Sequence, residues 1–214
     1  MVRSGIALII PAYNEAATIY AVVKSASRYG QPIVIDDCST DATAELAERA
    51  GAVVVRHASN RGYDGALNTG FAEADRREFE SIITLDADGQ HDPELLSRFI
   101  DGLDQGADLV LGVRDRFPRC AERIFALYTR RRYGVHDPLC GMKAYRRSVY
   151  QRLGHFDSYK SIGTELALFG VKNNFSFCEI AFVVRDRQDS PRFGRLLSAN
   201  LRILRAMMRD LFRA

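Results

Sequence analysis

Cysteine is scarce in this chain of 214 residues, and long apolar segments are missing from it. No two of the four cysteines form a Cys-x-x-Cys pair, so neither a disulfide framework nor a zinc site is expected. We therefore expect reduced thiols in a cytoplasmic protein. No apolar run approaches the ~18–20 residues that a membrane-spanning helix needs. The early run Ile6–Ile10 has only the length of a strand and lacks the flanking features of a secretory signal.

Net charge is also low, at +3, but the charges are unevenly divided along the chain. Residues 1–109 carry 9 basic and 18 acidic side chains, whereas residues 110–214 carry 21 basic and 9 acidic ones. An acidic half joined to a basic half suggests that one half holds a metal ion while the other meets an anionic molecule. The alternative is a solvated surface on which the charges are unevenly distributed by chance.

Short apolar runs alternate with helical patterns along the first half of the chain. Strands are predicted at residues 6–10, 32–35, 52–55, 81–85 and 108–113. Helices are predicted over residues 16–28, from a cap at Ser39 or Thr40 to Ala50, within residues 62–74, and from residues 92–94 onward. This order predicts an α/β fold with a mostly parallel sheet and helices on both faces. No Gly-x-Gly-x-x-Gly follows the first strand, which favours a mononucleotide over a dinucleotide ligand.

The alternation breaks after Arg114. Residues 115–136 are rich in arginine and mix helical with loop patterns. Residues 141–153 indicate a strand running into a helix, and a helix at 164–170 and a strand at 176–185 follow. We interpret residues 1–194 as one domain and residues 195–214 as a basic amphipathic helix appended to it.

Three of the predicted strands end in clusters of polar residues, and parallel strands bring such ends to one edge of the sheet. Asp86 and Asp88 form the sharpest pair, because alternate residues of an extended segment point the same way. With the carbonyl oxygen of Gln90 they offer the hard oxygen ligands that bind Mg²⁺ or Mn²⁺ and leave room for substrate phosphates. Helix capping in an acidic loop is the alternative for this pair.

Four motifs occur in order along the chain. They are Ile9-Ile10-Pro11-Ala12-Tyr13-Asn14-Glu15, Asp36-Asp37-x-Ser39-x-Asp41-x-Thr43, Asn60-Arg61-Gly62 and Asp86-x-Asp88-Gly89-Gln90-His91-Asp92-Pro93-Glu94. Together they resemble the family 2 inverting glycosyltransferases, in particular the dolichyl- and polyprenyl-phosphate sugar transferases. The resemblance covers residues 5 to 195 or so, and it implies the nucleotide-sugar-binding GT-A fold.

The resemblance also implies roles for the matching residues. The residues at positions that hold the base and ribose of a nucleotide sugar are Pro11, Tyr13, Glu15 and Asp37. The residues in the metal-binding segment that neutralises the donor diphosphate are Asp86, Asp88 and Gln90, and Asp88 is also expected to be catalytic. A metal with fixed donors stabilises the charge that develops on a departing nucleoside diphosphate.

The second half carries weaker matches. Gly112-Val113-Arg114 resembles a Gly-x-Arg segment of the family, which places Arg114 at the nucleotide-sugar site. Residues 137–147 resemble a segment that usually reads Asp-Pro-Thr-Ser-Gly-Phe-Arg-Ala-Tyr. Cys140 replaces its serine, so one hydroxyl contact to an acceptor phosphate is missing. A nucleophilic Cys140 is an alternative without an evident histidine partner.

The choice of acceptor depends on whether a base is present. Thr164-Glu165-Leu166 stands where many relatives with hydroxyl acceptors have an aspartate base. A hydroxyl needs deprotonation, whereas a lipid phosphate is already an anionic nucleophile. Leu166 therefore favours the phosphate acceptor, although Glu165 is a candidate base. Cations for phosphates are expected from Arg187 and Arg192 on the donor and from Arg114, Arg123, Arg131 and Arg132 on the acceptor.

The last helix bears on the same choice. On a helical projection its arginines 195, 202, 205, 209 and 213 fall within an arc of about 80°. Leucine or methionine stands on the opposite side, at positions 197, 201, 204, 208 and 211. This pattern is typical of a helix lying on an anionic membrane surface. The alternative is a helix whose apolar side packs on the domain or on a second copy of the chain, in a homo-oligomer.

These observations favour a metal-dependent inverting transferase attached peripherally to the cytoplasmic face of the membrane. It would move a hexose from a GDP- or UDP-linked donor to polyprenyl phosphate and would bind no nucleic acid. A saccharide hydroxyl as acceptor, in surface-polysaccharide assembly, is the alternative within this class. A nucleotidyltransferase would need a glycine-rich signature with Arg and Lys where this chain has residues 11–15. A non-catalytic sugar-nucleotide-binding module would not need the metal segment.

Overall fold

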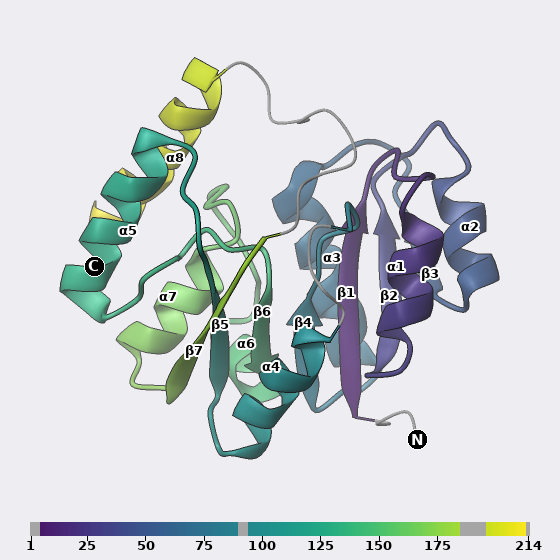
Figure 1. The fold of residues 1–214 in the computed structure, drawn as a ribbon, viewed down its shortest axis with the longest axis horizontal. Helices are drawn as coiled ribbons and strands as arrows, with labels where there is room; N and C mark the ends of the chain where they lie inside the picture. The colour runs from purple at the N-terminus through teal and green to yellow at the C-terminus, as the bar shows by residue number, and fades with distance from the viewer. Residues whose placement is uncertain (1–4, 90–93, 185–195, 213–214) are drawn as a thin grey trace.

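The computed structural model describes residues 5–89, 94–184 and 196–212, and one twisted sheet runs through this part of the chain (Figure 1). Its seven strands are β1 (Ile6–Ala12), β2 (Gln31–Asp36), β3 (Val53–Arg56), β4 (Ser81–Thr84), β5 (Leu109–Arg114), β6 (Lys143–Arg146) and β7 (Phe177–Phe182). The helices are α1 (Ile19–Ala26), α2 (Thr43–Ala50), α3 (Gly62–Arg76), α4 (Leu95–Asp104), α5 (Cys120–Tyr133), α6 (Arg147–Leu153), α7 (Glu165–Lys172) and α8 (Leu196–Phe212).

The strands lie in the order β3-β2-β1-β4-β6-β5-β7. The pairs β1–β2, β1–β4, β2–β3 and β5–β7 are parallel, and β6 runs antiparallel between β4 and β5. β1, β2, β4 and β5 therefore all end at the same edge, the upper one in Figure 1, which we call the carboxyl edge. The predicted α/β fold with a mostly parallel sheet is confirmed.

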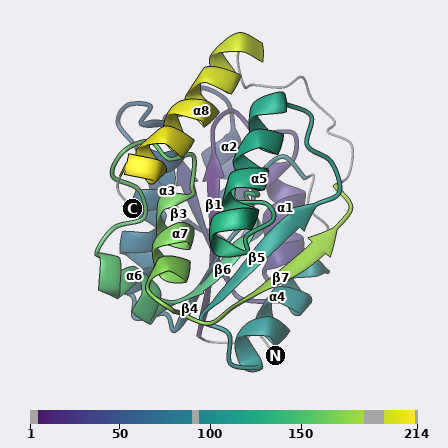
Figure 2. The same ribbon diagram turned by 90° about the vertical axis from the view of Figure 1, so that its left-hand side faces the viewer.

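Two apolar cores lie on opposite faces of this sheet. Successive side chains of a strand point to opposite faces, and β1 contributes to both cores for this reason. Leu8 and Ile10 belong to one core with Phe99 of α4, whereas Ile9 belongs to the other with Phe71 of α3. All five side chains are buried, and helices cover both faces of the sheet as predicted (Figure 2).

The start of α2 differs from the sequence-based prediction. The helix predicted to begin with a Ser39 or Thr40 cap begins at Thr43 instead. The Ser39 hydroxyl and the Thr40 amide are used elsewhere, since each is hydrogen-bonded to Asn14 in the preceding loop. The arginine-rich stretch 115–136, which shows mixed patterns, contains the continuous helix α5. This helix ends at Gly134, which has a left-handed backbone with a φ of 75°.

The C-terminal helix α8 packs beside α5 through a short apolar face (Figure 2). Ile203 and Ala206 are buried there, and so is the carboxylate of Asp210. That carboxylate accepts hydrogen bonds from Lys172 Nζ at 2.7 Å and from the Tyr128 hydroxyl at 3.2 Å. Positions 201, 208 and 211 of the predicted apolar side are exposed. The packing face is therefore not the one that the helical projection indicates.

Across the residues that the structure describes, no helix combines the length and the apolar character that spanning a bilayer requires.

Candidate functional site

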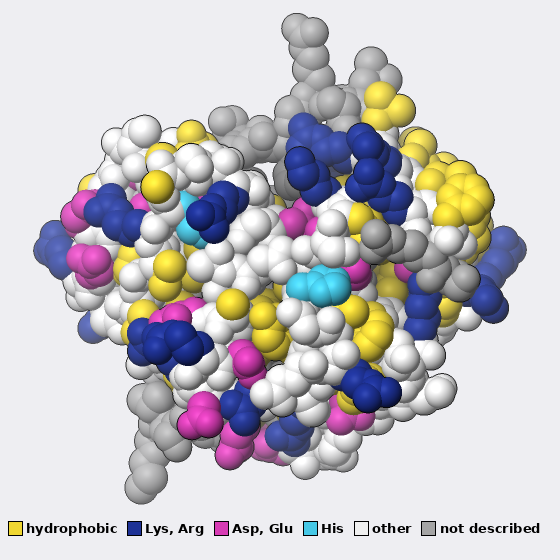
Figure 3. Space-filling view, turned by 180° about the vertical axis from the view of Figure 1, so that it is seen from behind, with side chains coloured by type: hydrophobic (Ala, Val, Ile, Leu, Met, Phe, Trp, Pro, Cys, Tyr) yellow, Lys and Arg dark blue, Asp and Glu magenta, His cyan; other side chains and the backbone are white. Residues whose placement is uncertain are grey.

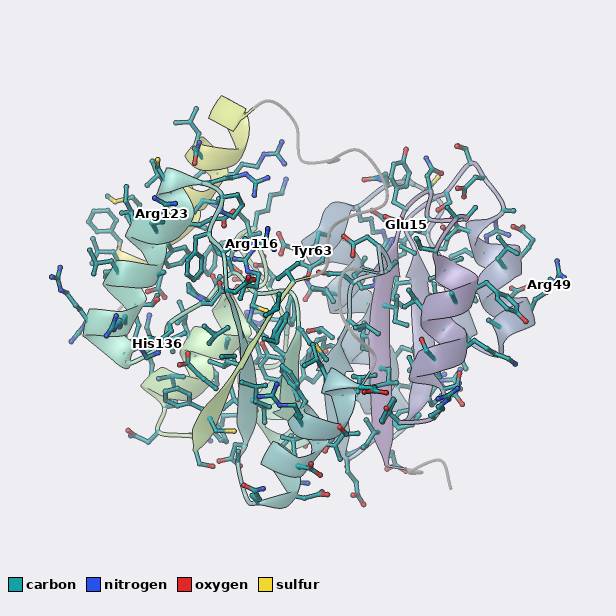
Figure 4. The ribbon with its side chains drawn as sticks, viewed as in Figure 1. Glu15, Arg49, Tyr63, Arg116, Arg123 and His136 are labelled. Atoms are coloured by element: carbon teal, nitrogen blue, oxygen red, sulfur yellow. The ribbon has the colours of Figure 1, made fainter. Side chains whose placement is uncertain are left out.

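The polar loops that follow β1, β2 and β4 come together at the carboxyl edge. Figure 4 shows Glu15 at the end of β1 and Tyr63, from the start of α3, reaching the same edge near the middle of the sheet. Arg116 follows β5 on the other side of Tyr63. The predicted convergence of strand-end residues is thus present.

Much of the first two motifs is used to join two loops to each other. The amide of Asn14 donates to Ser39 Oγ at 2.9 Å, and Asn14 Oδ1 accepts from the Thr40 amide at 2.8 Å. The amide of Glu15 donates to Thr43 Oγ1 at 2.7 Å. Asn14 has a left-handed backbone with a φ of 54°, a conformation that asparagine adopts more readily than most residues. These bonds fix the loop that carries Tyr13, which is exposed, and Glu15, which is buried, directly after the half-buried Pro11 near the end of β1.

Asp37 anchors the third motif. Its carboxylate accepts hydrogen bonds from the amides of Arg61 at 2.8 Å and Gly62 at 2.7 Å, and it contacts His57 Nδ1 at 2.7 Å. The other ring nitrogen of His57 lies 2.9 Å from Thr69 Oγ1. Asp37 is buried, and its bonds to these two amides fix the turn that begins α3. Its contact with a nucleotide stays a prediction.

The proposed metal ligands Asp86 and Asp88 follow β4 directly, and both are half-buried. The hydroxyl of Tyr63 donates to Asp86 Oδ1 at 3.4 Å. Gly141 faces the same carboxylate so closely that a Cβ there would lie 2.3 Å from Asp86 Oδ2. Any larger residue at position 141 would therefore displace the Asp86 carboxylate, which gives a physical reason for the glycine of the 137–147 motif.

The carboxylates of Asp86 and Asp88, two residues apart, form a donor set that fits a hard divalent cation. Gln90, the third predicted ligand, lies outside the described residues. Among the residues that are described, no group of three or more His, Cys, Asp and Glu side chains could hold a metal by itself. An ion held by Asp86 and Asp88 would keep open positions for substrate oxygens.

Arg114 is held by an acidic partner. Its guanidinium donates two hydrogen bonds to Asp137, from Nε at 2.7 Å and from Nη2 at 2.9 Å, and its amide donates a third at 3.1 Å. Nη2 also lies 3.7 Å from Glu122 Oε2, a buried oxygen that has no hydrogen-bond partner among the described residues. Asp137 is buried and Arg114 largely so. The pair thus fastens the end of β5 to the 137–147 motif.

Cys140 is buried close to the charges of Asp137 and Arg114. Burial, aided by the negative charge of Asp137, raises the pKa of the Cys140 thiol to about 12. The thiol therefore stays protonated near neutral pH, and a nucleophilic role for Cys140 has no support.

Lys143 of β6 is a site residue to which the sequence assigns no role. It is buried, and its Nζ donates to the carbonyl oxygen of Gly163 at 2.8 Å. Burial lowers its pKa to about 8, against the opposing effects of Cys140, Asp137 and Asp86. A buried ionisable group with a shifted pKa close to other ionisable groups, here Asp86 and Asp137, is typical of a functional site. Its sequence signal is the 137–147 motif, in which Lys143 stands where the family segment usually has arginine.

Glu165, the candidate base, begins α7 and is tied to the preceding loop. Its carboxylate accepts hydrogen bonds from the Ser158 amide at 2.5 Å and the Ser158 hydroxyl at 2.8 Å. His155 Nε2 lies 3.1 Å away. Leu166, which stands at the position where relatives have aspartate, is fully buried. Glu165 therefore holds residues 155–158 in place.

The predicted cations do not all gather at this edge. Arg131 and Arg132 lie in the last turn of α5, at the opposite end of that helix from Cys120. Arg123 lies near its start, where its Nε donates to the Phe117 carbonyl at 3.3 Å. Arg187 and Arg192 lie outside the described residues.

Replacing Asp64 with asparagine should stabilise the protein at pH 8 by about 2–3 kcal/mol. Burial, with the nearby charge of Asp157, raises the pKa of Asp64 to about 6 from 3.8. The folded state therefore holds this proton more tightly, and the wild-type free energy of unfolding falls as pH rises from 4 toward 6. Asparagine can still accept from the Gly163 amide, which Asp64 accepts at 2.8 Å. Urea unfolding at pH 4 and pH 8 measures the difference in the free energy of unfolding between the wild type and Asp64→Asn. An equal difference at the two pH values would contradict the assignment.

Comparison with known proteins gives three kinds of match. The model of the family described as "Glycosyl transferase family 2" matches residues 7–154. Polyprenol monophosphomannose synthase of Mycolicibacterium smegmatis is 30% identical over 85% of this chain and 77% of that protein. Undecaprenyl-phosphate 4-deoxy-4-formamido-L-arabinose transferase of Pseudomonas paraeruginosa is 34% identical over 69% of this chain but only 49% of that protein. This chain thus spans about half the length of the second relative.

A solved structure is similar over nearly the whole chain. It is glucosyl-3-phosphoglycerate synthase of Mycobacterium tuberculosis in complex with Mn²⁺ and uridine-diphosphate-glucose, with a TM-score of 0.76 and 25% identity. The similarity covers 96% of this chain and 78% of that one.

Proposed function

The chain belongs to glycosyl transferase family 2, and we propose that it moves a hexose from a nucleotide sugar to polyprenyl phosphate, with inversion and with Mg²⁺ or Mn²⁺. It is a glycosyltransferase with the GT-A fold, as the order of the four motifs predicts. This membership argues against a nucleotidyltransferase. The nucleotide, the metal and the acceptor are proposals supported by the site and by the relatives.

The donor half of the proposal is supported by the carboxyl edge. Asp86 and Asp88 would hold the cation, which neutralises the diphosphate when bound, and the related mycobacterial synthase was crystallised with Mn²⁺ and UDP-glucose. Pro11 lies near the end of β1, and the loop that follows with Tyr13 and Glu15 is pre-fixed by its bonds to residues 39–43. A loop that needs no ordering on binding is suited to hold the nucleoside. Asp37 would contribute from the next strand, and Arg187 and Arg192 from beyond β7.

The acceptor half is carried by one observation, the engagement of Glu165. Its carboxylate is committed to the loop of Ser158 and His155, and the next residue is a buried leucine. Transfer to a hydroxyl needs a carboxylate that is available to take a proton, whereas transfer to a phosphate does not. Two relatives are named for transfer to polyprenol or undecaprenyl phosphate, which supports the same acceptor class.

Glu165→Gln tests this assignment. Transfer of labelled sugar to polyprenyl phosphate should stay within about threefold of the wild type, because no proton is abstracted in that reaction. The assay measures label extracted with the lipid, at saturating donor and Mn²⁺. A folded Glu165→Gln variant that loses about 100-fold or more would show that Glu165 is a base, and a hydroxyl acceptor would replace the phosphate.

A lipid acceptor would bring the described domain to a membrane surface. We therefore propose that the activity takes place at the cytoplasmic face, with peripheral attachment through this domain.

A further inference from the structure

A large apolar area is exposed along the flank formed by α5 and α8, at the left of Figure 1. The side chains concerned are between 42% and 78% exposed, and they are Ile124 and Leu127 of α5 and Leu201, Met208, Leu211 and Phe212 of α8. We call these six residues the flank patch. A soluble monomer seldom exposes so many large apolar side chains together, and such patches mark protein or membrane contacts.

The two parts of the flank patch are continuous. A shallow groove of about 450 Å³ runs between the helices, and its lining includes Ile124 and Leu127 from α5 and Met207 from α8. The packing face of α8 points elsewhere, because Ile203, Ala206 and Asp210 are buried against the domain. α8 thus has one apolar face that serves the fold and a second, outward one that the fold leaves uncovered.

All exposed charges on these two helices are positive, within the residues described. Their two acidic residues are buried and paired, Glu122 with Arg119 and Asp210 with Lys172. The exposed charged side chains are Arg123, Arg130, Arg131, Arg132, Arg202 and Arg205. Figure 3 shows basic side chains beside the apolar ones on this flank, at the right of that view. The flank therefore combines an apolar strip with a border of one sign of charge.

We propose that the flank patch and its arginines dock the protein on an anionic lipid bilayer. Apolar side chains would enter the boundary between headgroups and acyl chains, and the arginines would meet lipid phosphates. The proposal deepens the proposed function, because it names the surface by which the chain would reach a lipid acceptor. α5 and α8 also begin at the carboxyl edge (Figure 1), so docking along them holds that edge close to the headgroups.

A second copy of the chain fits this surface less well. A two-fold interface sets the same patch against itself, which would bring the arginines of α5 and α8 toward those of the partner. Like charges across an interface are unfavourable, and the flank offers no exposed acidic side chain on either described helix to offset them. An anionic bilayer is complementary to the same surface.

Vesicle co-sedimentation of the full chain tests the proposal. Vesicles of phosphatidylcholine with phosphatidylglycerol are compared with pure phosphatidylcholine, at low and high salt, without nucleotide or polyprenyl phosphate. Binding to the anionic vesicles should be at least about tenfold tighter, and Arg130→Gln/Arg205→Gln should weaken it by roughly 10–30-fold. The matched control is Arg28→Gln/Arg49→Gln, which removes two exposed arginines from the α1–α2 side and should change nothing (Figure 4).

A second variant separates insertion from simple attraction. Leu201→Ser/Met208→Ser should bind anionic vesicles at low salt and release them at high salt. High salt screens the attraction of the arginines, and this variant has lost the apolar contact that would still hold the wild type. The proposal is overturned if the wild type stays in the supernatant at low salt, or if the control variant loses as much binding. It is also overturned if sedimentation velocity shows a dimer that these flank substitutions dissociate and the wild type does not bind vesicles. Because no substrate is present, failure here leaves the proposed transfer reaction untouched.

Discussion

Replacing Asp88 with asparagine should lower sugar transfer by about 100–1,000-fold without unfolding the chain, a loss typical of removing one electrostatic contact to a transition state. Asp88 is half-buried two residues after Asp86, on the loop that follows β4. Asparagine keeps the size and one oxygen of the side chain but removes the charge that would hold the cation near the diphosphate. Initial rates at several Mn²⁺ concentrations measure the loss, and circular dichroism checks the fold.

Asp101→Asn provides the matched control, since Asp101 is an exposed carboxylate on α4. It should leave both the rate and its dependence on Mn²⁺ unchanged. Isothermal titration with Mn²⁺ and nucleoside diphosphate gives a readout independent of turnover. If folded Asp88→Asn binds the ion and turns over as the wild type does, the metal assignment is wrong and Asp88 returns to a capping role.

The sheet was predictable because its strands are short apolar runs that end in polar clusters. Residues 6–10 and 32–35 show this pattern, and they form most of β1 and β2. The direction of β6 was not predictable, since residues 143–146 form only a short run whose pattern is the same in either direction. Its antiparallel place between β4 and β5 depends on pairing with strands distant in the sequence.

The candidate site was predictable in position but not in its internal bonding. The motifs identify which loops meet at the carboxyl edge, but they do not show which polar groups bind each other. Asn14, Ser39 and Thr43 join two loops, and Asp37 fixes the turn before α3. Lys143 shows the same limit, because the motif indicates a basic residue at this position but not that it is buried. Burial is decided by tertiary packing, which a local pattern does not contain.

Asp137→Asn should lower the free energy of unfolding by about 3–5 kcal/mol, the usual cost of removing one partner of a buried ion pair. The carboxylate is buried and accepts from the Arg114 amide and from two of its guanidinium nitrogens. Asparagine offers one acceptor oxygen and turns an NH₂ group toward these donors. Among the described residues, Arg114 would then keep Glu122, 3.7 Å away, as its remaining ion-pair partner. Urea unfolding at pH 7 measures the change.

A carboxylate that pairs with exposed arginines provides a comparison with this buried pair. Glu73 of α3 is half-buried but bridges the exposed Arg76 and Arg77 at the end of that helix, and Glu73→Gln should cost less than about 1 kcal/mol. Replacing both partners, as Arg114→Met with Asp137→Leu, should recover part of the stability that Asp137→Asn loses, because no uncompensated charge then remains buried. If Asp137→Asn costs no more than Glu73→Gln, the pair does not hold β5 to the 137–147 motif. Arg114 would then be available for the contact to an acceptor phosphate that its charge predicts.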